Sequence, residues 1–377
     1  MTDDLLYVGV LFSQNGPMAV TEKAHLKGIL TAISEINTCK KKSHPTIIPI
    51  IEDPISDPNI YRQLAHKLIT KDRVRVIFGC CSSASRKAVL GVIEHHGGLL
   101  FYPSFYEGYE YCPNILYGGA SPNQMIIPLI NYLFKHYGEN FLLIGSDYIY
   151  PREINRIARE FLQESTGKIA GEIYITSGSS TDQFYQAMSA VSEDHIDSII
   201  STVVGEDTAK LYHAYQKSSF DPKYTPIASL TTSENELATM VQAARANHLT
   251  AASYFYTIKN KASLRFHKYY ANLYNELDYP GIYAETTYTQ MHLYSQAVSK
   301  AQTDNVDSIL SCLLGMRYDA PQGTIMIDPD NNHTFVTPKI GLSRRDGGFD
   351  IVWQANDWIK PDPYLISYDR MITSNTV

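Results

Sequence analysis

The chain lacks the long apolar run that a membrane-spanning helix requires. None of its 377 residues lie in a stretch that approaches about eighteen uninterrupted apolar residues, although 44% of the residues are hydrophobic. With 19% charged residues, the composition is that of an ordinary water-soluble protein. The sequence therefore predicts no membrane insertion.

Positive charge is scarce as well. Lysine and arginine total 32 against 39 aspartates and glutamates, a net charge of -7. The one short basic run, Lys40 to Lys42, is typical of the solvated end of a helix, whereas a nucleic-acid surface needs clustered basic residues. Direct binding of nucleic acid is not expected.

Cysteine and histidine patterns give no metal site. The five cysteines form no CxxC motif and no Cys/His ligand spacing, and the adjacent Cys80 and Cys81 are poorly placed to bridge each other. His95 and His96 point about 100° apart on a helix and cannot share one ion, so they are expected at its surface. We expect free thiols in a reducing compartment, no metal and no other cofactor.

The familiar catalytic motifs are missing. The sequence contains no GxSxG, no GxxxxGK[ST], no GxGxxG after the first strand and no HExxH. An amidase remains one alternative, but the sequence pairs no nucleophile with a base. No catalytic residue is predicted, and the chain is expected not to be an enzyme.

Short apolar strands alternate with amphipathic helices along the chain. Apolar spacing predicts helices through Leu26 and Ile36 and through Tyr288 and Val298. This alternation predicts an α/β fold of parallel sheets built from right-handed crossovers. The predicted strands span residues 7–12, 75–79, 99–103, 141–145, 198–204 and 227–230.

The length of the chain indicates two domains, since single domains are about half this size. Residues 118–122 have the composition of a linker, and two hairpin-like runs, 324–327 and 349–353, follow near the end. Two α/β halves with a chain that crosses between them more than once would suit this order.

Hydroxyl and phenol side chains follow three of the predicted strands, where open parallel sheets bind their ligands. The segments are CCSSAS at 80–85, SFYE at 104–107 and SDYIY at 146–150. Ser85 is interpreted as a helix cap, and Ser83 as either a cap or a ligand contact. Pro151 suits the first position of a helix.

Tyr148 and Tyr150 are expected to project from one side of an extended segment and to wall a cleft. A phenol both donates and accepts, which suits a group that carries C=O and NH2. An amino-acid ligand would need a fixed acid for its ammonium group, and only Glu107 is available, which is expected to brace its loop. A small neutral ligand fits better.

Several segments resemble a known family: IGSDYIYPRE (144–153), YPSFYEGYEYCPNILYGG (102–119), IASLTTSE (227–234), STVVG (201–205) and DAPQG (319–323). They are similar to the amide-sensing regulators of bacterial aliphatic amidase operons, in the amide and urea receptor branch of the type I periplasmic binding proteins. The likeness runs from residue 8 to residue 364.

This resemblance implies two lobes hinged by three crossings, with the ligand clamped between them. The expected lobes are residues 1–118 with about 252–325, and about 119–251 with 326–377. Family ligand contacts fall on Ser83, Tyr102, Ser104, Tyr148, Tyr150, Val204 and Thr231. Two departures, Cys81 in place of a tyrosine and Phe105 in place of a proline, would reshape the pocket.

The resemblance also implies a partner. A cytoplasmic receptor of this kind restrains an RNA-binding antiterminator protein and releases it when an amide binds. The acidic N-terminus without a secretory signal pattern favours that role. The alternative is an exported component of an ABC transporter for urea or short-chain amides, with a signal peptide removed. A homodimer also stays open as an alternative.

Overall fold

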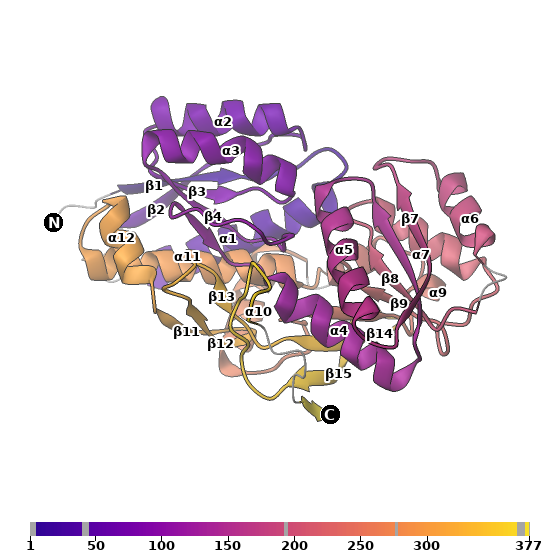
Figure 1. Ribbon diagram of the computed structural model, residues 1–377. Helices are drawn as coiled ribbons and strands as arrows, with labels where there is room; N and C mark the ends of the chain where they lie inside the picture. The colour runs from indigo at the N-terminus through magenta and orange to yellow at the C-terminus, as the bar shows by residue number, and fades with distance from the viewer. Residues whose placement is uncertain (1–4, 40–44, 192–194, 276–277, 368–373, 377) are drawn as a thin grey trace.

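The computed structural model describes residues 5–39, 45–191, 195–275, 278–367 and 374–376. They form two α/β lobes, each built on a mainly parallel sheet with helices on both faces (Figure 1). The predicted fold class is confirmed. The basic run Lys40 to Lys42 lies outside the described residues.

The first lobe contains a five-stranded sheet in which every neighbouring pair is parallel. Helices α2 (Pro58–Thr70) and α3 (Ser83–His96) cover one face, and α1 (Ala19–Cys39) and α11 (Ile282–Ala301) cover the other (Figure 1). In spatial order the strands are β2 (Thr46–Glu52), β1 (Leu5–Leu11), β3 (Val76–Gly79), β4 (Leu99–Tyr102) and β5 (Ile115–Tyr117).

The second lobe contains an eight-stranded sheet that is parallel from β7 to β10 and antiparallel beyond. In spatial order its strands are β16 (Ser374–Thr376), β15 (Phe349–Ala355), β14 (Lys339–Ser343), β10 (Leu249–Ala252), β9 (Ile227–Ser229), β8 (Ser198–Thr202), β6 (Asn140–Ser146) and β7 (Lys168–Ile175). Its helices are α4 (Pro122–His136), α5 (Ile149–Gln163), α6 (Thr181–Ala190), α7 (Asp207–Gln216), α8 (Glu234–Ala238) and α9 (Gln242–Arg245).

A small antiparallel sheet joins β11 (Arg317–Ala320), β12 (Gly323–Ile327) and β13 (Thr334–Phe335). The two predicted hairpin-like runs are therefore strands of different sheets. Residues 324–327 lie in β12, whereas residues 349–353 lie in β15, which pairs with β14 and β16. Helices α10 (Lys261–Leu273) and α12 (Val306–Leu313) complete the chain. The lobe boundaries stay a prediction. The one at 325 falls inside β12, so a boundary after Phe335 suits the sheets better.

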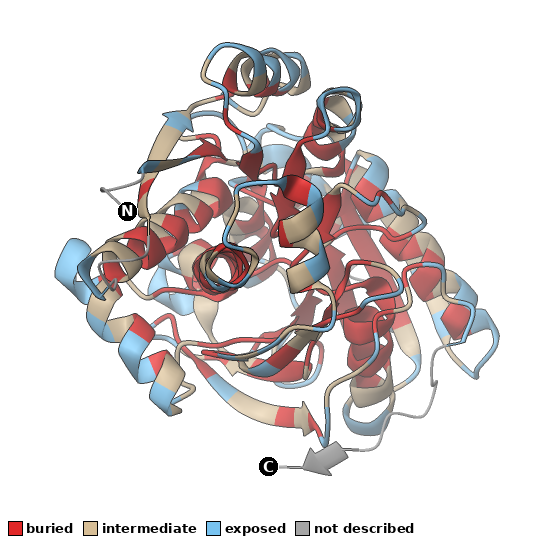
Figure 2. Cartoon of the chain, turned by 90° about the vertical axis from the view of Figure 1, so that its left-hand side faces the viewer, coloured by how far each residue is buried: buried red, intermediate tan, exposed pale blue. Residues whose placement is uncertain are grey.

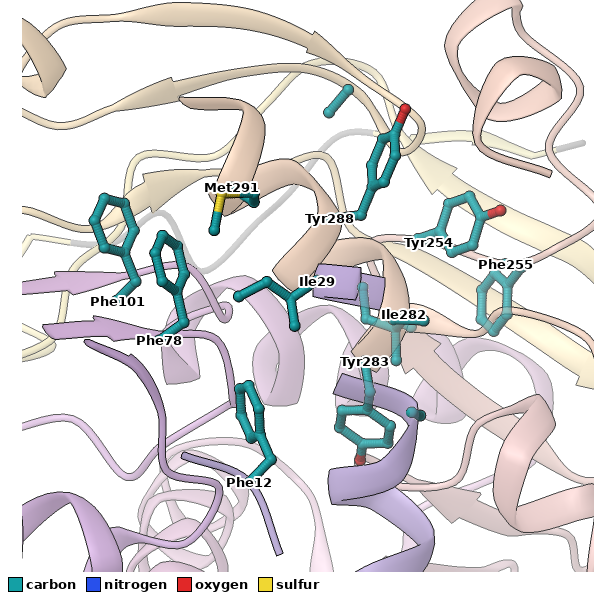
Figure 3. Packing of buried hydrophobic residues seen from close by; sticks show 14 of the residues in the cluster. Phe12, Ile29, Phe78, Phe101, Tyr254, Phe255, Ile282, Tyr283, Tyr288 and Met291 are labelled. Atoms are coloured by element: carbon teal, nitrogen blue, oxygen red, sulfur yellow. The ribbon is translucent and has the colours of Figure 1, made fainter. Parts of the chain in front are cut away.

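The lobe cores are formed by apolar strands and the inner helix faces, which Figure 2 shows as continuous buried segments. In the first lobe the rings of Phe78 and Phe101 stack with centroids 4.5 Å apart, close to Met291 of α11 (Figure 3). Helices α1 and α11 touch backbone to backbone, because a Cβ atom on Gly28 would lie 2.0 Å from the carbonyl oxygen of Ala284. This close crossing holds the first turn of α11 against α1.

Candidate functional site

A small cavity lies between the two lobes, at the carboxyl ends of the parallel strands. Its volume is about 30 Å³, and one water needs about 10–15 Å³, so it holds a ligand of a few non-hydrogen atoms. None of its lining side chains is charged. They are Met18, Thr21, Cys81, Ser82, Ser83, Ser104, Phe105, Tyr148, Tyr150, Val204, Thr231 and Tyr283.

Eight of the nine residues predicted for the site line this cavity, and Tyr102 is the exception. The Tyr102 ring is fully buried below it, and its hydroxyl donates to the carbonyl oxygens of Cys81 (2.8 Å) and Phe105 (3.1 Å). Tyr102 thus holds two lining loops together instead of facing the cavity. Whether the other eight contact a ligand stays a prediction.

Sequence reasoning missed four lining residues: Met18, Thr21, Ser82 and Tyr283. Met18 and Thr21 follow the first strand at the start of α1, so the rule applied to the other strand ends would have found them. Tyr283 lies in the first turn of α11, and the sequence offers no signal that this helix reaches the cleft.

The loop after β3 is held by a buried ion-pair cluster. Ser82, not Ser85, caps α3, and its side-chain oxygen accepts from the Ser85 amide at 3.1 Å. The neighbouring Ser83 hydroxyl donates to Glu107, which pairs with the fully buried Arg86 at 3.1 Å. Glu107 therefore braces its loop, as predicted, and the ion pair fixes the orientation of Ser83.

Helix α5 begins at Ile149, two residues before Pro151, so the predicted start was late. Tyr148 is the extended N-cap residue and Tyr150 lies in the first turn, so the two do not share one extended segment as predicted. Both rings still reach the cavity. Burial raises the pKa of both phenols above their ordinary value, which keeps them protonated.

Ser104 is paired with His25, a residue of α1 that does not line the cavity. His25 Nδ1 lies 2.8 Å from the carbonyl oxygen of Tyr283, which can only accept, so Nδ1 carries the proton. Burial lowers the pKa of His25 to about 3, so the ring is neutral and Nε2 is an acceptor. The Ser104 hydroxyl, 3.0 Å away, therefore donates to Nε2.

This serine and histidine pair does not form a hydrolytic site. A general base works best with a pKa near the working pH, far above the pKa of His25. The group that orients the ring is a backbone carbonyl, which cannot stabilise an imidazolium as a carboxylate does. The pair instead positions the Ser104 oxygen.

Most cavity hydroxyls present only lone pairs to a ligand. The hydroxyls of Thr21 and Thr231 donate to Glu236 (2.8 Å) and to the Val203 carbonyl (2.6 Å), and the Tyr283 phenol donates to the Thr231 carbonyl (2.7 Å). The hydroxyls of Ser83 and Ser104 also donate within the protein, to Glu107 and to His25. These five oxygens can therefore only accept from a ligand.

Tyr148 and Tyr150 supply the complementary donors. Within the described part of the chain, no hydrogen bond joins either phenol to the protein, and both residues line the cavity. A carbonyl oxygen can accept from these phenols while N–H groups donate to the surrounding acceptors. Phe105, Val204 and Met18 leave room for a short apolar group.

Three hydrogen bonds next to the cavity connect the lobes. Thr21 of α1 reaches Glu236 of α8, and Tyr283 of α11 reaches Thr231 after β9. The amide of Glu206, after β8, donates to the Pro17 carbonyl at 3.2 Å. The cavity is therefore enclosed by contacts that exist only when the lobes are together.

Other predicted features can be located in the structure. All five cysteines are free, and burial raises the pKa of the Cys81 thiol well above its usual value. His95 and His96 are exposed at the end of α3, as predicted. Among the described residues, no group of three or more metal-ligating side chains could hold an ion. None of the described helices is long and apolar enough to cross a bilayer.

Similar solved structures share the whole fold. A solute-binding protein of an ABC transporter from Rhodopseudomonas palustris, in complex with p-hydroxybenzoic acid, superposes with a TM-score of 0.84 at 19% identity, over 97% of this chain and 100% of that one. The branched-chain amino acid transporter substrate-binding protein of Streptococcus pneumoniae, in complex with isoleucine, gives 0.81 at 19%, over 95% and 100%.

The sequence is similar to one further protein over part of its length and to a family model over nearly all of it. A protein described as limonene hydroxylase from Geobacillus stearothermophilus is 25% identical over 120 residues, which is 32% of this chain and only 22% of that protein. The model of the periplasmic binding protein domain matches residues 6–370, almost the entire chain. This family consists of solute-binding proteins. The chain belongs to the periplasmic binding protein family.

Proposed function

We propose that the protein is a receptor that closes over a small neutral molecule of the amide or urea class and releases it unchanged. The hydrogen-bond polarity of the cavity carries the proposal. Five lining residues have hydroxyl oxygens that can only accept, and two others, Tyr148 and Tyr150, have phenols that can donate. An amide or urea places its N–H groups and its carbonyl oxygen in complementary positions.

The cavity disfavours the ligand types bound by the structural relatives. Benzoates and isoleucine carry a carboxylate, which would meet mostly accepting oxygens here, and no lining side chain carries a positive charge to balance it. Arg86, three residues beyond Ser83, is already paired with Glu107 and Glu110. A volume of about 30 Å³ is also too small for a benzene ring in this closed form.

Calorimetry with acetamide, propionamide, formamide, urea, benzoate and isoleucine tests this function. We expect at least one of the small neutral compounds to bind more tightly than either carboxylate. Tighter binding of benzoate or isoleucine than of every amide and urea would contradict the proposal. Sodium acetate provides a matched control, because it has the size of acetamide but a charge.

The structural relatives favour transport as the biological role. They are binding proteins of ABC transporters, so delivery of urea or short-chain amides to a permease agrees with them. The sensor that controls an RNA-binding antiterminator, its cytoplasmic location and a homodimer rest on the sequence alone. Adjacent permease and ATPase genes would favour transport, and an adjacent antiterminator gene would favour the sensor.

The Tyr150 hydroxyl is expected to donate to the ligand carbonyl. Losing such a bond costs roughly 1–3 kcal/mol, so Tyr150→Phe should weaken binding about ten- to a hundredfold in calorimetry. Tyr224→Phe is the matched control, since Tyr224 is 65% exposed, away from the cavity, and should bind normally. Unchanged affinity in folded Tyr150→Phe would remove this phenol from the site.

A further inference from the structure

A second, smaller cavity lies directly behind the ligand cavity. Its volume is about 10 Å³, and it is bounded by the starts of α4 and α5 and by the loop after β9. Its lining is largely apolar and contains no charged side chain. The residues are Phe105, Tyr106, Ala120, Ser121, Pro122, Met125, Ile126, Tyr150, Ile154 and Leu230.

The two cavities share two residues, Phe105 and Tyr150. Phe105 packs against two hydrophobic clusters, one that extends through both lobes and one in the second lobe, and its ring centroid lies 5.9 Å from that of Tyr283. The Phe105 side chain is only half-buried, unlike Tyr102 and Tyr106 beside it. It therefore forms a wall between the two cavities, with room to move that its neighbours lack.

Apart from the Tyr150 phenol, which both cavities share, the polar side chains that line the second cavity are already hydrogen-bonded. The Ser121 hydroxyl donates within the cap of α4, to Asn123 at 2.7 Å and to Gln124 at 3.0 Å. The rest of the wall consists mainly of apolar side chains from Met125, Ile154 and Leu230. Such a space suits hydrocarbon and offers no partner to a second polar group.

We propose that the second cavity is an apolar subsite for the acyl chain of a longer amide, and that Phe105 closes it and so limits ligand length. This inference rests on the proposed amide-binding function. The amide group would stay between the phenols and the accepting hydroxyls, and its chain would point past position 105 toward Met125 and Ile154. With phenylalanine at this position, only short chains fit.

Phe105→Ala tests the inference, because it joins the two cavities. Each buried methylene should strengthen binding about fourfold. In calorimetry, the affinity for butyramide relative to acetamide should therefore rise at least about tenfold over the wild-type ratio. Phe105→Leu preserves more of the packing, so it should raise the affinity for butyramide relative to acetamide by a smaller factor. Near-ultraviolet circular dichroism of this variant reports whether it is folded.

Leu264→Ala is the control. Leu264 is 53% exposed on α10 and lines neither cavity, so the wild-type chain-length preference should persist. A wild-type preference in both Phe105 variants would overturn the subsite while leaving amide binding intact. A wild-type protein that binds no amide or urea would instead overturn the proposed function, and the subsite with it.

Discussion

Gly205→Ala is expected to lower ligand affinity at least about a hundredfold, or about 2.7 kcal/mol. A Cβ atom at this position would lie 2.3 Å from the carbonyl oxygen of Pro17, which belongs to the opposite lobe. The clash falls beside the hydrogen bond between Glu206 and Pro17. The lobes would have to separate, and a ligand stabilises closure only through contacts that the open form lacks.

Backbone strain must be separated from this clash. Gly205 has a φ of +63°, a conformation that costs an alanine roughly 1–2 kcal/mol. Gly178→Ala is the matched control, because Gly178 has a φ of +80° but a Cβ there would have no atom within 4 Å. Both variants should lose similar stability, and only Gly205→Ala should lose affinity. Equal ligand affinities in the two variants would show that the close approach of Gly205 to Pro17 is not needed for the lobes to close.

Arg86→Met is expected to reduce the free energy of unfolding by about 3–5 kcal/mol, since it removes the main partner of the buried Glu107 carboxylate and of the partly buried Glu110 carboxylate. Arg86 is fully buried and donates to Glu110 at 2.7 Å and to Glu107 at 3.1 Å. Its guanidinium also lies 4.8 Å from the ring centroid of Tyr106. Urea denaturation measures the loss, and calorimetry should show weaker binding because Glu107 no longer fixes Ser83.

Arg152→Met serves as the surface control. Arg152 pairs with Asp147 at 2.7 Å and covers the Tyr174 ring, but its side chain is half exposed, so its loss should matter far less. Replacing Glu107 and Glu110 by glutamine in the Arg86→Met background should restore much of the stability, because no charge is then left unpaired. A small effect of Arg86→Met alone would contradict the role of the cluster.

The central strands could be predicted because burial on both faces produces continuous apolar runs. All six predicted strands are present, including VIFG at 76–79 and LLFY at 99–102. Most of the strands missed are short or lie at sheet edges, although β14 is an internal strand. β2 is an edge strand that contains Pro49, and β7 is an edge strand that contains Gly171 next to a register shift. Pro49 interrupts the apolar run of β2, and Gly171 and polar residues interrupt that of β7, so neither segment has the pattern of a central strand.

The site could be predicted where it follows strand ends and not where it depends on long-range packing. Ser83, Ser104 and Tyr150 were found because parallel strands gather their carboxyl ends at one edge. The His25 contact that orients Ser104 joins residues 79 positions apart, and Tyr283 enters from a helix far along the chain. Nor could spacing reveal that the Tyr102 hydroxyl turns toward two backbone carbonyls.

The central claim is that the lobes close on a ligand held between them. Small-angle X-ray scattering of the wild-type protein and of Gly205→Ala, with and without saturating acetamide or urea, tests it most directly. The radius of gyration of the wild type should fall on binding, whereas that of Gly205→Ala should stay constant. A wild-type radius that stays constant while calorimetry shows the ligand bound would contradict closure.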